Sequence, residues 1–320
     1  MPETSKGTIT VVGAGFMGAV IATLYAHYGY KVILTDLTAK SLETYRTRAG
    51  PIARSLVGGG MELDAIFANV ETETDLEKAV KDAFFVHEVI HEDLKAKQSL
   101  FEQLDRICPR EVVLGTNTSS LKLSDICSNV TNRDRVIGVH YITPAHIVKV
   151  VELIVADFTP KTLIDWSKRF LGTIDHVGVV CTDTPGFLVN RLQYALLSEA
   201  YRIVEEGAAS RDDVDATMKL SIGPRLALWG PLLTEDLVVS KKTSADIWDY
   251  LYRKTKLEKF QRPAGITRFV EQNRLGAISG AGWYRFGRDY ASVVTSRDSQ
   301  LKSLLDWLEK NNRVEEFEAS

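Results

Sequence analysis

The feature that most constrains the fold is a glycine pattern between two apolar segments near the start of the chain. The segment TVVGAGFMGAVIATLYAHYGYKVILTD places Gly13, Gly15 and Gly18 in a G-x-G-x-x-G arrangement and ends on Asp36. The first glycine permits a tight turn, the second lets the backbone approach a pyrophosphate, and the third lets a helix pack closely on a strand. This order predicts a strand, a phosphate-binding turn, a helix and a second strand.

A carboxylate at the end of the second strand can accept hydrogen bonds from an adenosine ribose and repels a 2′-phosphate. We therefore expect NAD(H) rather than NADP(H) as the cofactor. The residues expected to bind it here are Gly13, Gly15, Phe16, Met17, Gly18 and Asp36. A glycine turn followed by an ordinary surface aspartate is the alternative interpretation. A dinucleotide site alone leaves the reaction open, because many dehydrogenases share this arrangement.

The first half of the chain alternates short apolar runs with helical patterns, as βαβ units do. Strands are expected at residues 8–12, 31–35, 84–90, 112–116 and 136–141, and helices at 17–28, 40–56, 75–81 and 94–107. Several strands are apolar throughout, which is typical of a parallel sheet covered on both faces. We predict an α/β fold with a Rossmann-type doubly wound sheet. The glycines at 58–60 follow no strand and are expected to form a loop between helices.

A further strand is expected at 174–180, after which the segment CTDTPGF breaks the pattern and strand-like runs nearly vanish. Helices are expected at 187–206, 211–219, 244–251, 266–272 and 299–311. We therefore predict an NAD-binding domain at 1–184 and an all-α substrate and dimerisation domain at 185–320. The helix at 187–206 is apolar on nearly all sides, so we expect it to be buried and to take part in a homodimer. The extension after Gly287 is expected to add one amphipathic helix.

Composition limits the class of protein. The 320 residues are 45% hydrophobic, enough for two modest cores, and the net charge of -3 gives no basic balance for binding nucleic acid. The start MPETSKG does not resemble a secretory signal, and no apolar run is long enough to cross a membrane. Cys108, Cys127 and Cys181 lack metal-ligand spacing and are expected to be reduced, buried thiols. We expect a soluble cytoplasmic protein without a metal.

Oxidation of an alcohol requires a base for the hydroxyl proton, and histidine suits this role near neutral pH. Of the six histidines, His27, His87, His91 and His176 are expected to be structural. His140 ends the apolar run VIGVH, at the edge where ligands bind in such a sheet, and His146 lies in the loop that follows. Glu152 lies in the apolar run VVELI, where a carboxylate needs a partner. We expect Glu152 to pair with His140 and to fix its tautomer; a glutamate facing water is the alternative.

Two further polar stretches are candidates for the site. GTNTSSL, at 115–121, follows a strand and offers the side chains of Asn117 and Ser119, although a helix cap with turn residues is an equal alternative. In the apolar helix at 187–206, Asn190 and Ser198 need partners. We expect one of these partners to be the substrate or the base.

Taken together, GAGFMG with Asp36, HEDLKAK, TNTSSL, VIGVHYITP, VVELI and TPGFLVNRLQYALLSEAYRIVEEG resemble the L-3-hydroxyacyl-CoA dehydrogenase superfamily over residues 8–287. The segment GPRLALWGPL is more similar to the branch with lambda-crystallin, an L-gulonate 3-dehydrogenase, and L-carnitine dehydrogenase. The resemblance implies that His140 is the catalytic base and Glu152 its partner, with Ser119 and Asn190 at the substrate. It also implies that Glu92, Lys97, Asn117 and Thr143 lie near the cofactor.

The sequence departs from this pattern in three places. Thr143 stands where the family usually has asparagine, and Ile278 stands where the acyl-CoA enzymes have lysine. The segment at 40–60 is shorter than theirs, and it carries only scattered basic residues, namely Lys40, Arg46, Arg48 and Arg54. A small anionic substrate is therefore expected, with Arg225 clamping its carboxylate; a salt bridge is the alternative for Arg225.

The sequence thus predicts an NAD-dependent dehydrogenase that oxidises the 3-hydroxyl of a small L-3-hydroxy acid to the 3-keto acid. One alternative is a 3-hydroxyacyl-CoA dehydrogenase that acts on CoA thioesters. Another, of a different class, is a redox-silent, crystallin-like protein that only binds NAD. The expected partners are a small substrate and a second copy of the chain, with no nucleic acid and no membrane.

Overall fold

The computed structural model describes residues 7–56 and 63–311. The glycines at 58–60, for which we predicted a loop, lie outside this part. The chain divides into two compact units, residues 1–196 and 197–320. The units are described separately below.

The first unit is built on one sheet. Its strands are β1 (Thr8–Val12), β2 (Lys31–Thr35), β3 (Val70–Glu73), β4 (Ala83–Glu88), β5 (Val113–Thr116), β6 (Val136–Tyr141), β7 (Val150–Val155) and β8 (Val177–Thr182). Within the described residues they form an eight-stranded sheet in the order β3-β2-β1-β4-β5-β6-β7-β8. Neighbouring strands run parallel except β6 and β7, which are antiparallel. The strand order reverses between β1 and β4, where such sheets bind ligands. The predicted doubly wound sheet is confirmed.

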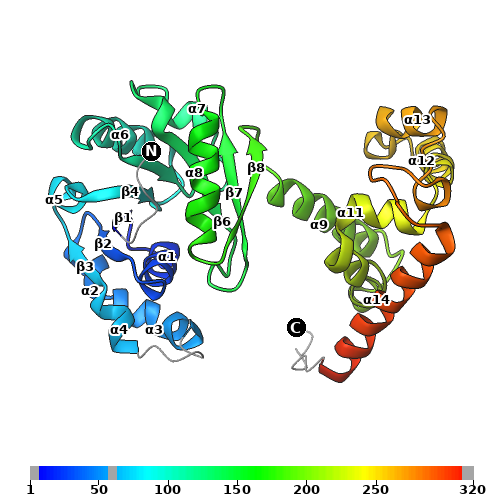
Figure 1. The fold of residues 1–320 in the computed structure, drawn as a ribbon, viewed down its shortest axis with the longest axis horizontal. Coiled ribbons are helices and arrows are strands. Elements are labelled where there is room, and N and C mark those ends of the chain that lie inside the picture. Colours follow the sequence, from blue (N-terminus) through cyan, green and yellow to red (C-terminus); the bar gives the residue numbers. More distant parts are fainter. Residues whose placement is uncertain (1–6, 57–62, 312–320) are drawn as a thin grey trace. The chain divides into compact units, whose positions relative to one another are not determined.

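Helices cover both faces of this sheet (Figure 1). The helices α1 (Phe16–His27), α3 (Tyr45–Leu56), α4 (Leu63–Ala68) and α8 (Lys161–Gly172) share one core cluster with the strands. The helices α5 (Leu76–Val80), α6 (Leu94–Ile107) and α7 (Leu123–Ile126) share a second cluster with them. Both large apolar cores of the described residues therefore lie in the first unit, one on each face of the sheet.

Several boundaries in this unit differ from our predictions. The helix expected at 40–56 is two helices, α2 (Ala39–Glu43) and α3, which break at Thr44. Residues 173–175 form a turn with a positive φ at Asp175, so β8 begins later than expected. The strand β3 and the helices α4, α7 and α8 were not predicted. The polar sequence VETE of β3 carries no strand pattern, whereas α8 buries residues at helical spacing.

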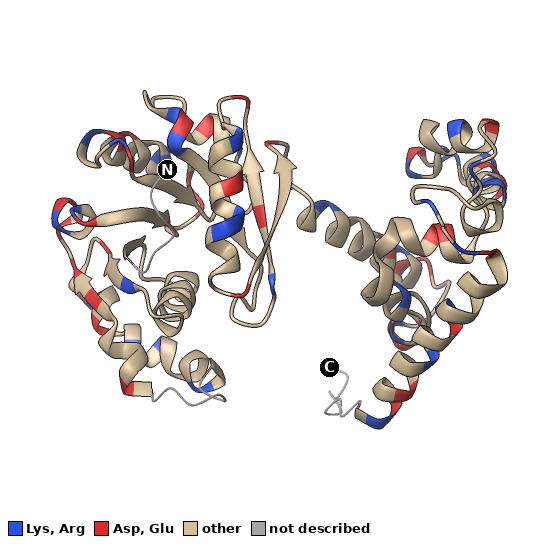
Figure 2. Ribbon diagram, viewed as in Figure 1, with Lys and Arg blue, Asp and Glu red and all other residues tan. Residues whose placement is uncertain are grey.

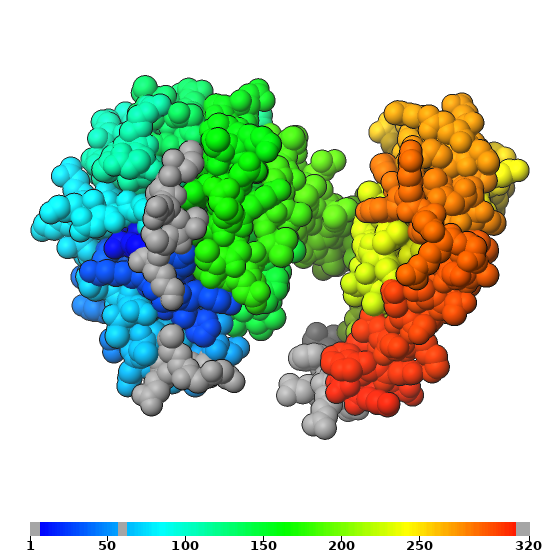
Figure 3. Space-filling view, in the orientation of Figure 1, coloured from blue at the N-terminus to red at the C-terminus, as the bar shows by residue number. Residues whose placement is uncertain are grey.

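The second unit is helical, as predicted. The helix α9 (Val189–Glu205) runs into it from the first unit. Its other helices are α10 (Arg211–Thr217), α11 (Gly223–Val238), α12 (Lys241–Thr255), α13 (Ala264–Glu271) and α14 (Tyr290–Asn311). The unpredicted α11 kinks at Gly230, where φ is +68°. The helix α14 is longer than expected, lies on the surface of the unit (Figure 3), and mixes acidic with basic side chains (Figure 2).

The second unit has little core of its own. Among the described residues its buried apolar side chains are Pro224, Ala245, Ile266, Phe269 and Ala277. The helix α9 has no buried residue, and Tyr201 is 67% exposed. Our prediction that this helix is buried is wrong for the single chain, because its apolar side chains find no surface to pack against among the described residues. No helix in the described part of the chain is long and apolar enough to span a bilayer.

Candidate active site

The glycine turn lies between β1 and α1, and its three glycines meet different constraints. Gly13 has φ +112°, and an added Cβ would lie 2.6 Å from the Val89 carbonyl oxygen. A Cβ on Gly18 would lie 1.8 Å from the Gly13 oxygen, so this glycine lets α1 pack against the turn. A Cβ on Gly15 would meet no atom within 4 Å. The backbone at Gly15 therefore borders open space, as a pyrophosphate site requires.

Asp36 ties the end of β2 to this turn. Its Oδ2 accepts a hydrogen bond of 2.8 Å from the Ala14 N–H, and its Oδ1 accepts one of 3.3 Å from the Thr38 N–H. Arg48 holds the other side of Ala14 by donating from Nη2 to its carbonyl oxygen. A carboxylate oxygen has a second lone pair, so these contacts leave Asp36 able to accept from a ribose as well.

A pocket of about 690 Å³ opens beside the turn, at the carboxyl ends of β1, β2 and β4. Its lining includes Gly13, Gly15, Asp36, Leu37, Ser41, Val89, Ile90, His91 and Leu100. Apolar walls with a few polar groups are typical of ligand sites of this size. The open backbone at Gly15, the Asp36 carboxylate and these apolar walls fit the adenosine half of a dinucleotide. Phe16 is exposed and Met17 half-buried at the start of α1.

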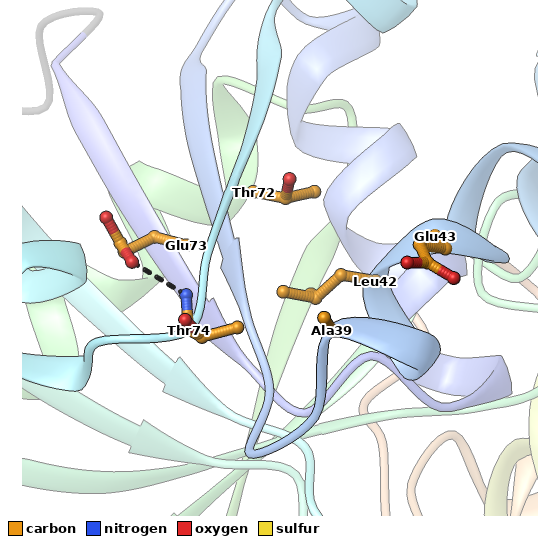
Figure 4. A pocket seen from close by; sticks show the side chains of 6 residues that line it. All are labelled: Ala39, Leu42, Glu43, Thr72, Glu73 and Thr74. Atoms are coloured by element: carbon orange, nitrogen blue, oxygen red, sulfur yellow. Dashed lines mark hydrogen bonds between the residues drawn. The ribbon is translucent and has the colours of Figure 1, made fainter.

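A second pocket, of about 250 Å³, lies between α2 and β3 (Figure 4). It is lined by Ala39, Leu42, Glu43, Thr72, Glu73 and Thr74. Glu73 Oε1 already accepts hydrogen bonds from the Thr74 and Asp75 N–H groups. With two acidic side chains and no basic one, this pocket does not fit a phosphate.

His140 and Glu152 face each other across β6 and β7. The antiparallel register pairs the two residues directly, and His140 Nδ1 lies 2.7 Å from Glu152 Oε2. His140 is 5% exposed and Glu152 is fully buried. Among the described residues nothing hydrogen-bonds to His140 Nε2. One nitrogen of the imidazole is thus held by a carboxylate, while the other has no partner in the part of the chain that the structure describes.

Glu152 is also held from the start of α9. Its Oε1 accepts hydrogen bonds of 2.8 Å from the Leu188 and Val189 N–H groups, which are free because Gly186 and Phe187 turn the chain with positive φ. Burial alone would raise the pKa of Glu152, but the hydrogen bonds from His140 and from these N–H groups bring that pKa below its usual value. An ionised carboxylate only accepts hydrogen bonds, so the proton of the neutral imidazole lies on Nδ1, and Nε2 is left as the acceptor.

Ser119 and Asn190 meet through one hydrogen bond. Asn190 Nδ2, in the first turn of α9, donates to the Ser119 carbonyl oxygen over 2.8 Å. Among the described residues the Ser119 hydroxyl has no hydrogen-bond partner. Asn190 directly follows Val189, whose N–H donates to Glu152, so hydrogen bonds together with the peptide bond between Val189 and Asn190 connect Ser119 to Glu152 and His140. The structure brings these four predicted residues together in the first unit.

Glu92 organises the loop that carries Ser119. Its Oε1 accepts from the Ser119 and Ser120 N–H groups and from the hydroxyls of Thr118 and Ser120, at 2.7 to 3.0 Å. Burial opposes the charge of Glu92, but these hydrogen bonds and the Lys97 charge lower its pKa overall. The stretch also has hydrogen bonds of the kind turn residues make, from the Thr118 N–H to the Thr116 hydroxyl and from the Leu121 N–H to the Thr118 hydroxyl.

Lys97 is buried beside two carboxylates. It is 1% exposed, and its Nζ donates to Glu88 Oε1 over 2.6 Å, with Glu92 Oε2 at 3.4 Å. Lys97 therefore holds Glu88 and Glu92 in place, and its place near the cofactor stays a prediction. Sequence reasoning missed Glu88, although this carboxylate lies in the apolar run FFVHEVI and, like Glu152, needs a partner.

The remaining predicted residues are more peripheral. Asn117 Oδ1 accepts from the Tyr141 N–H, and Thr143 donates to Met17 Sδ over 3.4 Å. In the second unit, Arg225 donates from Nε and Nη2 to Ser221, and Ile278 is 58% exposed. The three cysteines are free and buried. Among the described residues no group of three or more His, Cys, Asp or Glu side chains could hold a metal ion.

Comparison with known proteins assigns the family. Residues 8–184 match the NAD binding domain of 3-hydroxyacyl-CoA dehydrogenase, and residues 186–286 match the C-terminal domain of the same family. The mitochondrial hydroxyacyl-coenzyme A dehydrogenase of Sus scrofa is 32% identical over 87% of this chain and 90% of its own. The lambda-crystallin homolog of Homo sapiens is 31% identical over 74% of this chain and 76% of its own.

A solved structure is similar over nearly the whole chain. The 3-hydroxyacyl-CoA dehydrogenase of Archaeoglobus fulgidus superposes with a TM-score of 0.80 at 31% identity, covering 95% of this chain and 99% of its own. The two family regions together span most of the chain, and both named relatives are more than 30% identical to it. These matches agree with the dinucleotide site inferred from the glycine turn and the pocket beside it. The chain therefore belongs to the 3-hydroxyacyl-CoA dehydrogenase family and is an NAD-dependent oxidoreductase of that family.

Proposed function

We propose that this chain oxidises the 3-hydroxyl of a small, anionic L-3-hydroxy acid to the 3-keto acid, with His140 as the base. The observation that carries the proposal is the hydrogen bond of 2.7 Å between His140 Nδ1 and Glu152 Oε2, with Nε2 left unpaired. NAD, when bound, supplies the acceptor for the hydride that leaves the carbon bearing the hydroxyl. Gly13, Gly15 and Asp36 are the residues that would hold it.

The protein's part in the reaction is a proton transfer. His140 Nε2 accepts the hydroxyl proton, and the imidazole becomes an imidazolium with a proton on each nitrogen. Glu152 stabilises this positive charge across the Nδ1 hydrogen bond, and the N–H groups of Leu188 and Val189 keep its carboxylate from turning away. Ser119 and Asn190 are assigned to the substrate, because the Ser119 hydroxyl is exposed and Asn190 fixes its loop.

The choice of a small acid over a CoA thioester is supported by the basic residues near α2 and α3. Arg48 is occupied with the carbonyl oxygens of Ala14 and Ser41, and the Arg46 guanidinium lies over the Phe67 ring, 5.5 Å from its centroid. These two cations therefore have partners inside the protein and are less available for CoA phosphates. In Arg225, Nη1 has no partner among the described residues and could hold a substrate carboxylate.

The CoA thioester remains the second candidate, because the named relatives include acyl-CoA dehydrogenases. The two are separated by following NADH absorbance with L-3-hydroxybutyrate, L-gulonate and L-carnitine on one side and L-3-hydroxybutyryl-CoA on the other. The proposal expects the higher kcat/KM with a free acid. A higher value with the thioester would overturn the small-acid assignment, and NADH binding without any turnover would favour the redox-silent alternative.

We also propose that the chain forms a homodimer through its helical unit. The exposed apolar residues of α9, among them Leu192, Tyr194 and Tyr201, and the small core of the second unit support this. The family regions meet between residues 184 and 186, which supports the domain border that we predicted from sequence. A cytoplasmic location stays a prediction, supported by the free thiols. Light scattering tests the dimer, and a monomeric mass at working concentrations would overturn it.

A further inference from the structure

The last residues of β6 extend beyond the strand beside it. The last paired residues of β5 and β6 are Thr116 and Gly138, whereas β6 continues to Tyr141. Val139, His140 and Tyr141 therefore have no strand partner on the β5 side, although β7 pairs with them on the other side. Backbone groups buried without a partner destabilise a structure, so something else must bind them here.

Two side chains take the place of the missing strand. Asn117 Oδ1 accepts a hydrogen bond of 2.8 Å from the Tyr141 N–H. His87 Nε2 lies 3.1 Å from the Val139 carbonyl oxygen. His87 reaches Val139 from β4 across Gly115 of β5, with which it is in register. Thus the residues immediately before and after His140 are each held by a side chain from a neighbouring segment.

A buried chain of hydrogen bonds fixes the orientation of His87. A carbonyl oxygen can only accept, so Nε2 donates to Val139, and Nδ1 of the neutral ring accepts from the Tyr25 hydroxyl at 3.0 Å. Tyr25 in turn accepts from the Tyr141 hydroxyl at 3.2 Å. Burial lowers the pKa of His87 to about 3 and raises the pKa of Tyr25, so both groups stay neutral near neutral pH. This chain of hydrogen bonds starts at Val139 and returns to β6 at Tyr141, which directly follows His140.

We propose that His87, Tyr25 and Tyr141 are positioning residues for the reaction, because His87 binds the backbone before His140, while the Tyr141 side chain, linked to His87 through Tyr25, anchors the residue after it; together they hold the imidazole against Glu152. This inference rests on the proposed function of His140 as the base. A side chain of His140 that shifts with its backbone would lengthen the bond to Glu152, and small misplacements at a reacting group slow catalysis strongly. None of the three residues need touch the substrate.

A matched pair of variants separates the effect of the hydrogen bond from His87 to Val139 from the effect of the space that the His87 side chain fills. His87→Gln retains a donor near the position of Nε2, whereas His87→Met fills similar space without one. Tyr25→Phe removes the hydroxyl that orients His87. Tyr45→Phe is the control, since it also removes a buried tyrosine hydroxyl, one bonded to Thr23 Oγ1, but on a side chain with no link to His140.

The first readout is turnover, measured with whichever of L-3-hydroxybutyrate and L-3-hydroxybutyryl-CoA the unaltered protein oxidises faster. We expect kcat to fall about tenfold in His87→Met and Tyr25→Phe, to stay within about threefold in His87→Gln, and to be unchanged in Tyr45→Phe. The dissociation constant for NADH should not change. Loss of thermal stability with unchanged kcat in both His87→Met and Tyr25→Phe would overturn the proposal. If His87→Met fails to fold, Tyr25→Phe decides.

The second readout needs no substrate. A proton held between His140 Nδ1 and Glu152 gives a low-field NMR signal, which is assigned by its loss in His140→Gln. We expect the signal in the unaltered protein, His87→Gln and Tyr45→Phe, and its loss in His87→Met and Tyr25→Phe. Its retention in the last two would overturn the positioning role even if the proposed function holds. If the unaltered protein oxidises none of the three free acids named above, the proposed function fails, and this signal still decides the positioning role.

Discussion

The turn after β1 and the hairpin of β6 and β7 are constructed in different ways, although the carboxyl ends of β1 and β6 lie at the same edge of the sheet in the first unit. The turn is made of backbone: Gly15 borders open space, and the neighbouring glycines allow close packing. The hairpin is made of buried side chains, with His140 and Glu152 joined across the strands. Cofactor binding is therefore set by local sequence, whereas the proposed catalysis depends on residues that only the fold brings together.

The largest effect that separates the two regions is expected from His140→Gln. Glutamine cannot accept a proton, so kcat should fall about a thousandfold, which is within the range for general bases. The glycine turn is untouched, so the NADH dissociation constant should stay within about twofold. Steady-state kinetics and fluorescence titration measure the two quantities, with His27→Gln as the control. Unchanged turnover would remove His140 from the mechanism.

The next largest effects are expected from substitutions of the glycines. One substitution should lower the stability of the fold, and the other should weaken the binding of NADH. A Cβ on Gly18 would lie 1.8 Å from a carbonyl oxygen, so Gly18→Ala should destabilise the protein by about 1–3 kcal/mol. Gly15→Ala meets no atom and should unfold like the unaltered protein, yet its methyl group should weaken NADH binding about tenfold. Thermal unfolding and NADH titration distinguish them. Equal behaviour of the two variants would contradict the separate roles.

A smaller effect is expected from substitutions of Asp36. They can separate its two properties, which are accepting a hydrogen bond from the turn and carrying a negative charge. Asp36→Asn keeps an acceptor for the Ala14 N–H but loses the charge that repels a 2′-phosphate, and Asp36→Ala loses both. Both variants should shift the ratio of kcat/KM for NADP and NAD toward NADP by about tenfold. Only Asp36→Ala should also weaken the turn and lower thermal stability. A constant cofactor preference would discredit the assignment.

The smallest expected effect is the pH dependence contributed by Glu152. Its pKa is lowered in the folded protein, so its ionised form stabilises the fold above the ordinary pKa of 4.5, and this contribution is lost as pH falls through the lower folded value. Glu152→Gln should therefore lose stability less steeply with acid below about pH 4.5 than the unaltered protein does. Urea unfolding at several pH values tests this, with the exposed Glu111→Gln as control. An identical slope would show that folding does not lower the pKa of Glu152.

Local patterns made much of the first unit predictable. The glycine spacing with Asp36 and the apolar runs of β1, β2 and β6 determine their own structure, and their expected bounds agree with the observed ones. Proximity of His140 and Glu152 could be expected because each ends or interrupts an apolar strand in one hairpin. The same reasoning applied to Glu88 would have identified the buried partner of Lys97.

Other features depend on contacts that no local pattern records. The edge strand β3 has the polar sequence VETE and is recognisable only by its pairing with β2. The helix α8 is an exception, because Leu163, Trp166 and Phe170 follow helical spacing and this local pattern was overlooked. The apolar α9 was expected to be buried, but an apolar surface says only that something should cover it, not that the same chain does.

The central claim is that His140 accepts the proton of the 3-hydroxyl while the hydride leaves the carbon that bears this hydroxyl. The most direct test follows deuterium from L-3-hydroxybutyrate labelled at the carbon that bears the hydroxyl, with the unaltered protein and with His140→Gln. The account predicts deuterium in the reduced nicotinamide with the unaltered protein and almost none, in the same time, with His140→Gln. Transfer at the same rate in both proteins would contradict it.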